Sequence, residues 1–245
     1  MPKYISRPKA ESYGHAVGII LIEAVTPYIP GDVANASTYD FPVVFKTVPG
    51  VTIARLINDF DASLTGAVVE TAKYFEDIGV RLISGDCGFL INFQEAVAQA
   101  VSIPVALSSL LQLPIMERSC GPDKKVGIIT ANRSKLSDKL LLRAGLSDPA
   151  KAVVIGLEDF QPFRSPILDE KPLLDSELIE SGVVDRAKDM VAKNPEIESI
   201  LLECSCLPPY AHAVQAATGR PIFDFITMIN YFVGAQFRKP FGGFY

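Results

Sequence analysis

The feature that most constrains the fold of this chain is an internal repeat whose two copies are 117 residues apart, the separation of Cys87 from Cys204. When residues 80–105 are set against 197–222, seven positions are identical. Composition alone would give about one or two identities over such a window, so we infer a duplicated unit of strand, cysteine turn, helix and strand. The identical pairs are Ile83 with Ile200, Cys87 with Cys204, Leu90 with Leu207, Ala96 with Ala213, Val97 with Val214, Ala100 with Ala217, and Pro104 with Pro221.

Short β-branched runs alternate with longer amphipathic stretches along the whole chain, which is typical of parallel sheets flanked by helices. Two proline-containing segments, 26–38 and 157–174, resist this pattern and are expected to be loops beyond the carboxyl ends of strands. We expect strands at 16–22, 41–47, 79–85, 103–107, 125–130, 152–156, 197–203 and 221–223, and helices at 51–59, 62–77, 92–101, 108–118, 134–144, 175–193, 209–217 and 225–236.

Together, the repeat and the alternation predict an α/β protein made of two pseudo-symmetric Rossmann-like halves. Each half is expected to hold a mostly parallel sheet flanked by helices, with the active site in the cleft between the halves. The predicted first half spans 14–120 and the second 121–224, and the C-terminal helix within 225–245 is a candidate to pack back on the first half. Each half would then deliver one cysteine to the cleft.

The charge balance argues against large polyanionic partners. The chain has 245 residues with 23 basic and 28 acidic side chains, a net charge of −5, and the basic residues form no cluster. We therefore expect no nucleic acid and no membrane partner. The most apolar stretch, 16–22, is far shorter than the ~20 residues that cross a bilayer, and no apolar segment follows the basic residues near the N-terminus as in a secretion signal. We predict a cytoplasmic protein.

In that compartment the four cysteines are expected to be thiols. Only Cys204 and Cys206 are close in sequence, and the chain has two histidines, so no metal site is expected. Cys87 and Cys204 each lie where a strand ends and a helix begins, and the N-terminus of a helix lowers the pKa of a nearby thiol. Asp86 and Glu203 would raise that pKa, but neighbours in an extended chain point to opposite faces, so a weak effect is expected.

Two thiols on opposite sides of one carbon suit an inversion, in which a thiolate removes the Cα proton and a thiol returns a proton to the other face. This chemistry needs no cofactor, and no Walker A or Gly-x-Gly-x-x-Gly motif is present. A single free cysteine is more often a small buried hydrophobic residue, and this role is expected for Cys120. The symmetric placement favours catalysis for Cys87 and Cys204, whereas Cys206 could pack or contact substrate.

The half-repeats, the strand-end cysteines and the chain length resemble the aspartate/glutamate racemase family, which also contains hydantoin racemases, maleate isomerases and arylmalonate decarboxylases. The resemblance covers nearly the whole chain and implies cofactor-independent chemistry at Cα of a small carboxylate, with Cys87 and Cys204 as the acid/base pair. The family often has Asn-Thr after the first cysteine, where this chain has Gly88 and Phe89. Gly88 leaves backbone N–H groups to hold a carboxylate, Phe89 makes the site more apolar, and Ser205 keeps the hydroxyl of the family's threonine.

Thr130 and Asn132 follow a predicted strand and match a loop that in the family offers hydroxyl contacts to substrate, although a helix cap is an equally good explanation. The predicted substrate-binding residues are therefore Gly88, Phe89, Ser205, Thr130 and Asn132, and no metal or other cofactor is expected.

The resulting prediction is an isomerase, a racemase or epimerase of a small amino-acid-like carboxylate of the aspartate/glutamate type that uses paired cysteines. The alternatives are a hydantoin racemase, a maleate-type cis–trans isomerase, an arylmalonate-type decarboxylase and, in another class, a non-catalytic carboxylate-binding module. The expected partner is the small carboxylate itself. A homodimer is a further expectation, because relatives are often dimers and the segment 232–245 is rich in aromatic residues.

Overall fold

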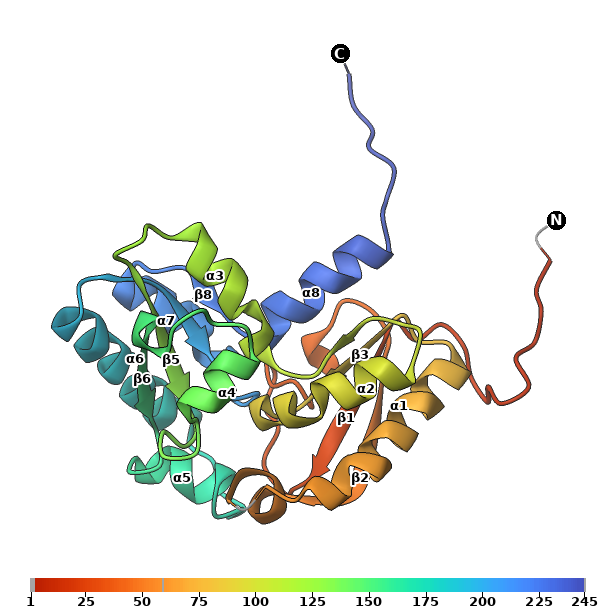
Figure 1. Cartoon of the computed structure of the whole chain (residues 1–245), viewed down its shortest axis with the longest axis horizontal. Coiled ribbons are helices and arrows are strands. Elements are labelled where there is room, and N and C mark those ends of the chain that lie inside the picture. The colour runs from red at the N-terminus through yellow and green to blue at the C-terminus, as the bar shows by residue number, and fades with distance from the viewer. Residues whose placement is uncertain (1–2, 59, 245) are drawn as a thin grey trace.

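In the computed structural model, which describes residues 3–58 and 60–244, the chain forms two four-stranded sheets whose strand pairs are all parallel (Figure 1). The strand order is the same in both halves, so the repeat in the sequence is also a repeat in topology. The prediction of an α/β fold with two similar halves is confirmed. The first sheet has the order β2 (Val43–Thr52), β1 (Val17–Glu23), β3 (Leu82–Gly85), β4 (Val105–Ala106), and the second β6 (Ala152–Gly156), β5 (Lys125–Thr130), β7 (Ile197–Leu202), β8 (Ile222–Phe223).

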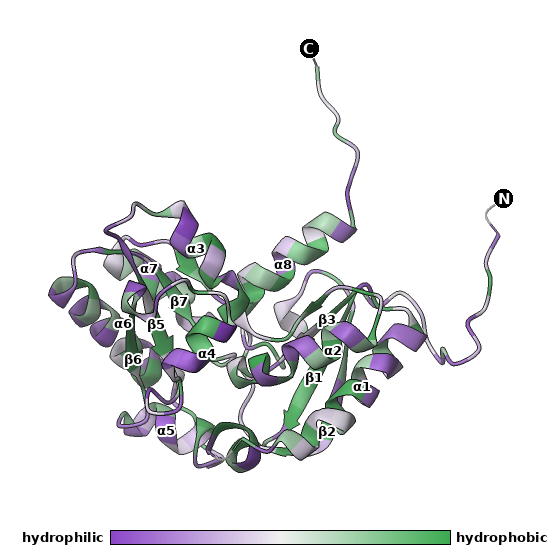
Figure 2. Cartoon of the chain, in the orientation of Figure 1, coloured by the Kyte–Doolittle hydropathy of each residue, from purple (hydrophilic) through white to green (hydrophobic). Residues whose placement is uncertain are grey.

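Helices connect the strands and cover the sheets, and the strands carry the most apolar residues (Figure 2). Short 3-10 helices, η4 (Gly88–Phe93) and η7 (Pro208–Tyr210), follow the two cysteines of the repeat. The α-helices are α1 (Thr65–Ile78), α2 (Gln94–Ala100), α3 (Leu113–Ser119), α4 (Asp138–Arg143), α5 (Gln161–Ile167), α6 (Ser176–Lys193), α7 (Ala211–Thr218) and α8 (Phe225–Gln236).

A glycine in each central strand lets a helix approach its sheet closely. A Cβ atom on Gly18 in β1 would lie 2.5 Å from Cγ of Phe75, a fully buried side chain of α1. A Cβ on Gly127 in β5 would lie 2.6 Å from Cε of Met190 in α6. The two halves therefore solve the same packing problem in the same way, with a large side chain of the covering helix above a bare strand position.

The halves are joined by helices that cross from one to the other. After β4, α3 packs against β5 of the second half, and after β8, α8 packs against β3 of the first. Phe225 and Met228 of α8 share a buried cluster with Val17. Where the crossing segments meet, the Gln112 side chain donates a 2.8 Å hydrogen bond to the Asp224 carbonyl. This reciprocal exchange fixes the two sheets relative to each other.

The structure corrects three local predictions. β2 continues through Pro49 to Thr52, because a proline is tolerated in an edge strand, so a helix does not begin at 51. A π-helical turn, Ala54–Asn58, follows, and residue 59 lies outside the described residues. The segment 157–174 contains α5, since Pro162 lies in its first turn, where a proline is well accommodated.

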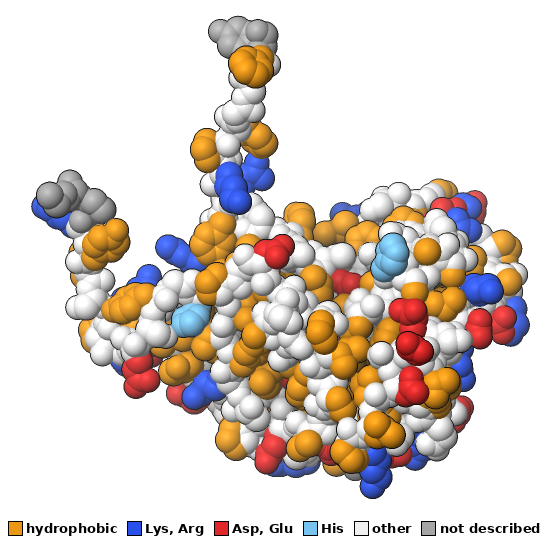
Figure 3. Space-filling view, turned by 180° about the vertical axis from the view of Figure 1, so that it is seen from behind, with side chains coloured by type: hydrophobic (Ala, Val, Ile, Leu, Met, Phe, Trp, Pro, Cys, Tyr) orange, Lys and Arg blue, Asp and Glu red, His pale blue; other side chains and the backbone are white. Residues whose placement is uncertain are grey.

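The described residues nearest to the two termini, from residue 3 at one end and up to residue 244 at the other, extend away from the body of the protein (Figures 1 and 3). α8 spans Phe225–Gln236, as predicted for the C-terminal helix, and Phe241 and Phe244 beyond it are exposed. Tyr245 is not among the described residues. None of the helices in the described part of the chain combines the length and apolarity needed to cross a membrane.

The two central glycines provide a matched test of this packing. Gly18→Ala is expected to lower the free energy of unfolding by about 1–3 kcal/mol, because the Phe75 ring is rigid and cannot yield. Gly127→Ala should cost less than about 1 kcal/mol, because the end of the Met190 side chain is flexible. Urea unfolding followed by circular dichroism measures both values, and equal losses would contradict the explanation.

Candidate active site

A small cavity of about 40 Å³ lies at the junction of the two halves. Residues that follow β1, β3 and β7 line it, so it lies at the carboxyl ends of strands from both sheets, where open α/β folds bind ligands. Both cysteines of the repeat, Cys87 and Cys204, line this cavity and are almost completely buried.

The two cysteines are positioned by equivalent turns. The Cys87 carbonyl accepts a hydrogen bond from the N–H of Leu90 at 3.0 Å, and the Cys204 carbonyl accepts one from the N–H of Leu207 at 3.1 Å. The N–H groups of the two residues inside each turn have no backbone acceptor within that turn, and the N–H of Phe89 donates to the sulfur of Cys87. Each half therefore presents a thiol and two N–H groups at the same place.

Hydrogen bonds between the halves hold these two turns together. The Ser205 hydroxyl donates to the backbone carbonyl of Asp86, and the Ser109 hydroxyl donates to that of Glu203 at 2.9 Å. The loop after β1 joins them, since the N–H of Val33 donates to the carbonyl of Ser205 at 3.3 Å. Hydrogen bonds to backbone carbonyls of the two turns thus set the relative position of the two thiols.

Glu203 is only 1% exposed and reaches across the junction to the first half. Its Oε2 accepts a 2.7 Å hydrogen bond from the Thr130 hydroxyl, whereas its Oε1 has no partner among the described residues. A Cβ atom on Gly88 would overlap Oε1, so the carboxylate occupies the space that this glycine leaves free. Burial raises the pKa of Glu203 to about 7.

Asp86, 5% exposed, is the corresponding carboxylate of the first half. Its Oδ1 accepts a 3.0 Å hydrogen bond from the N–H of Ile22, and burial raises its pKa well above the ordinary value. Burial also raises the pKa of Cys87 strongly, and Glu203 and then Asp86 raise it further. Cys87 is therefore a neutral thiol at neutral pH.

This result corrects the expectation that the neighbouring carboxylates act weakly on the thiols and that a helix N-terminus lowers the pKa of Cys87. The largest charge effect on Cys87 comes from Glu203 of the other half. Alternation along one strand says nothing about a side chain that approaches from a second sheet.

A third thiol, that of Cys206, contacts both Cys204 and a third carboxylate, that of Asp32. Cys206 lines the cavity, and Asp32, 2% exposed, comes from the loop after β1 and has a pKa raised to about 6 by burial. Throughout residues 3–58 and 60–244, no Lys, Arg or His lines the cavity. In the same residues, no group of three His, Cys, Asp or Glu side chains is arranged to hold a metal ion.

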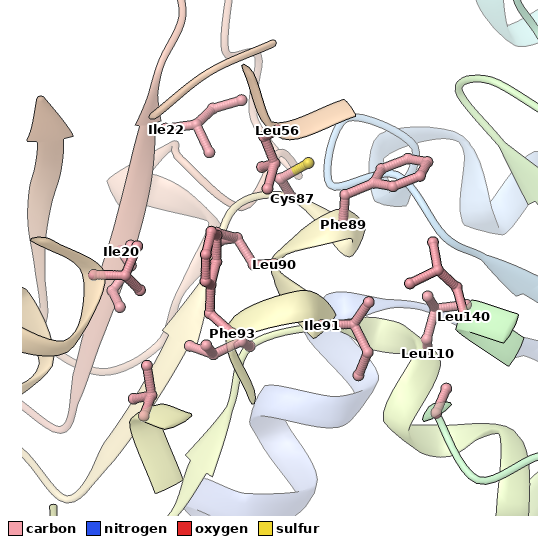
Figure 4. Packing of buried hydrophobic residues seen from close by; sticks show 14 of the residues in the cluster. Ile20, Ile22, Leu56, Cys87, Phe89, Leu90, Ile91, Phe93, Leu110 and Leu140 are labelled. Carbon is pink, nitrogen blue, oxygen red and sulfur yellow. The ribbon is translucent and has the colours of Figure 1, made fainter. Parts of the chain in front are cut away.

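The structure brings most of the predicted site residues together. Gly88, Phe89 and Ser205 line the cavity with the cysteines, and Figure 4 shows Cys87 close to Phe89. Thr130 does not line the cavity, but its hydroxyl donates a hydrogen bond to Glu203, which does. Asn132 faces elsewhere, since its Oδ1 accepts hydrogen bonds from Ser134.

Sequence reasoning gave no site role to Glu203, Asp86 or Thr26, which also line the cavity. For the first two a signal was available, because an acidic residue precedes the cysteine in both copies of the repeat. The hydroxyl of Thr26, buried and without a partner among the described residues, lies in an irregular segment that has no repeat to mark it.

Comparison with characterised proteins places the chain among enzymes. No family model matches the sequence. A dimethylsulfoniopropionate lyase of Durusdinium sp. clade D is 32% identical over 238 residues, covering 92% of this chain and 76% of that protein. Dimethylsulfoniopropionate lyase 7 of Emiliania huxleyi is 30% identical over 234 residues, covering 92% of this chain and 68% of that protein.

Solved structures confirm the racemase-like fold. A mutant of arylmalonate decarboxylase in its sulfate-associated form superposes with a TM-score of 0.61 at 17% identity, covering 92% of this chain and 96% of the other. Allantoin racemase from Pseudomonas fluorescens superposes with a TM-score of 0.61 at 16% identity, covering 90% and 92%. An aspartate racemase homologue from Pyrococcus horikoshii superposes with a TM-score of 0.55, covering 89% and 98%. The likeness is one of fold.

The expected function, an amino-acid-type racemase, is wrong, and so is the isomerase class. The relatives that match at 30–32% identity are lyases, whereas the racemases match in fold at 16% identity or below. The resemblance found in the sequence therefore identified the fold and an enzyme, and the reaction it implied is replaced by the finding from closer relatives.

The electrostatics of the site predict the reactivity of Cys87. Glu203→Gln removes the largest charge that opposes the thiolate, so the pKa of Cys87 should fall and its alkylation by iodoacetamide at pH 8 should become several-fold faster. Peptide mass spectrometry measures the modification of Cys87 separately from the other thiols. Glu198→Gln, on β7 but outside the cavity, is the control. An unchanged Cys87 rate in Glu203→Gln would show that the carboxylate does not act on this thiol.

Proposed function

This chain belongs to the dimethylsulfoniopropionate lyase family, and on that premise we propose that it is itself a lyase, which releases dimethyl sulfide from dimethylsulfoniopropionate. The observation that carries the proposal within the structure is the pair of thiols, Cys87 and Cys204, that two halves of the chain bring to one small cavity. Such an elimination requires a base close to the substrate carbon that is bonded to the carboxylate, and a thiolate can serve as that base.

The reaction follows from the structure of the substrate. Dimethylsulfoniopropionate has a carboxylate at one end of a three-carbon chain and a dimethylsulfonium cation on the carbon at the other end. The base takes a proton from the carbon next to the carboxylate. The electron pair of that C–H bond forms a C=C bond, and the C–S bond breaks with its electron pair moving to sulfur. The products are acrylate, neutral dimethyl sulfide and a proton that the base passes to solvent, and no atom is oxidised by an outside reagent.

Elimination needs one base rather than two, because dimethyl sulfide leaves as a neutral molecule and takes no proton. The two thiols can therefore have different roles. Burial together with Glu203 and Asp86 keeps Cys87 protonated. We accordingly assign the base to Cys204, and to Cys87 the role of a neutral group that lines the substrate site.

The substrate carboxylate becomes more negative as the Cα proton leaves, so it needs donors that are already oriented. The N–H groups inside the turn at Cys204, those of Ser205 and Cys206, and the unpartnered Thr26 hydroxyl fit this role. The carboxylate of Glu203 lies over Gly88, so a substrate carboxylate on that side would meet a like charge. Gly88 therefore contributes space rather than the carboxylate contact expected from the sequence.

Single-cysteine variants test this assignment. Cys204→Ser is expected to lower kcat for dimethyl sulfide release by at least about 10³-fold, because a serine hydroxyl is a far weaker acid than a thiol and is not ionised at neutral pH. Cys87→Ser should lose less, on the order of 10–100-fold, since serine keeps a small neutral group at this position and leaves the base in place. Gas chromatography of the headspace over purified protein measures the product.

Cys120→Ser is the matched control, because Cys120 follows α3 and lies outside the cavity. It should leave the rate unchanged. A larger loss in Cys87→Ser than in Cys204→Ser would reverse the two roles. Wild-type protein that releases no dimethyl sulfide would refute the proposed lyase activity.

A further inference from the structure

We infer that the Glu203 carboxylate binds the sulfonium cation of the substrate, so that the cavity selects carboxylates that also carry a positive charge over carboxylates of the same shape that lack it. The inference rests on the proposed function and adds to it the group that binds the positively charged end of the substrate.

One oxygen of the buried Glu203 carboxylate lacks a hydrogen-bond partner within the described part of the chain. Thr130 holds its Oε2, and the absent side chain of Gly88 gives Oε1 room, but Oε1 is buried and has no partner among the described residues. A buried carboxylate oxygen without a partner is costly, and native proteins nearly always satisfy one. Since no basic side chain of the described residues lines the cavity, a ligand that carries a positive charge can supply the partner that Oε1 lacks.

The other titratable groups of the site are less suited to this role. Asp86 Oδ1 already accepts a hydrogen bond from the N–H of Ile22, and Asp32 Oδ1 accepts one of 2.8 Å from the N–H of Ala34. Asp32 also does not line the cavity. The remaining titratable groups that face the cavity are Tyr28 and the thiols Cys87, Cys204 and Cys206. Of these carboxylates, Glu203 is the one whose buried oxygen is left unpaired.

The walls of the cavity match the remainder of a dimethylsulfonio group. A sulfonium has no N–H to donate, so it is bound through its charge and through contact of its methyl groups with apolar and aromatic surface. Ile22, Ile53 and Phe89 line the same cavity as Glu203. A charge pair in such a water-poor site is stronger than one at the protein surface, so it can discriminate between ligands of equal shape.

A pair of isosteric ligands tests the inference without relying on catalysis. 3-(Trimethylammonio)propionate and 4,4-dimethylpentanoate have the same shape and carboxylate, and only the first carries the positive charge. Isothermal titration calorimetry with wild-type protein should give a Kd for 3-(trimethylammonio)propionate at least about tenfold lower than for 4,4-dimethylpentanoate, which lacks the positive charge. Glu203→Gln, which keeps the shape and removes the charge, should reduce this ratio to within about twofold, whereas Glu198→Gln should preserve it.

Two further measurements separate a charge role from a structural one. Gly88→Ala keeps the charge but displaces the flexible end of Glu203, so it should also reduce the preference. Because burial raises the pKa of Glu203 to about 7, the carboxylate ionises as the pH rises through 7, and the wild-type affinity for the cationic ligand should increase over that range. Glu203→Gln should abolish this increase.

Equal affinity of wild-type protein for both ligands would overturn the inference, as would a cation affinity that falls as the pH rises, which is the behaviour of a protonated Glu203 donating to the ligand carboxylate. Dimethyl sulfide release by the same wild-type preparation reports on the proposed function separately. Release without charge preference would refute the role of Glu203 alone. Charge preference without release would refute the lyase reaction and uphold the cation site.

Discussion

At the junction of the two sheets, Cys87, Cys204, Asp86 and Glu203 are buried together, and no basic side chain of the described residues shares their cavity. Burying a charge without a partner costs several kcal/mol, and the side chains respond by holding their protons more tightly. Burial accordingly raises the pKa of both carboxylates and of Cys87. A site of this kind favours a ligand that brings a positive charge, and the proposed function depends on that condition.

The scaffold that enforces this burial is symmetric, but the chemistry placed on it is not. In each half a cysteine turn follows a central strand, β3 or β7. The helices α3 and α8 cross between the halves and fix the two sheets relative to each other. The residues around the turns differ, because Glu203 is one methylene longer than Asp86 and extends over Gly88. Inversion of a stereocentre requires two thiols of interchangeable role, whereas elimination of a neutral sulfide requires one base. The unequal surroundings of Cys87 and Cys204 suit the second reaction.

Much of the fold could be predicted from the sequence, because the signals were periodic and repeated. The match of 80–105 with 197–222 marked the halves, and the predicted strands at 125–130 and 152–156 coincide with β5 and β6. Errors arose where proline was taken only as a breaker. Pro49 lies within an edge strand and Pro162 begins α5, positions that depend on sheet order and helix phase rather than on local composition.

For the site, the sequence indicated Cys87 and Cys204 through the repeat, and the family resemblance added Gly88, Phe89 and Ser205; all five line the cavity. It did not predict that Glu203 would act on Cys87, since that contact joins residues of separate sheets. The reaction was also beyond the sequence pattern, because racemases and lyases can share the strand-end cysteines of one fold.

The most direct test of the account is proton NMR of dimethylsulfoniopropionate incubated with the wild-type protein in D₂O. The account predicts that acrylate and dimethyl sulfide appear in equal amounts as the substrate disappears. Intact substrate that only exchanges the hydrogens next to its carboxylate for deuterium would contradict it, because a base would then be present without elimination. A spectrum that does not change at all would contradict it as well.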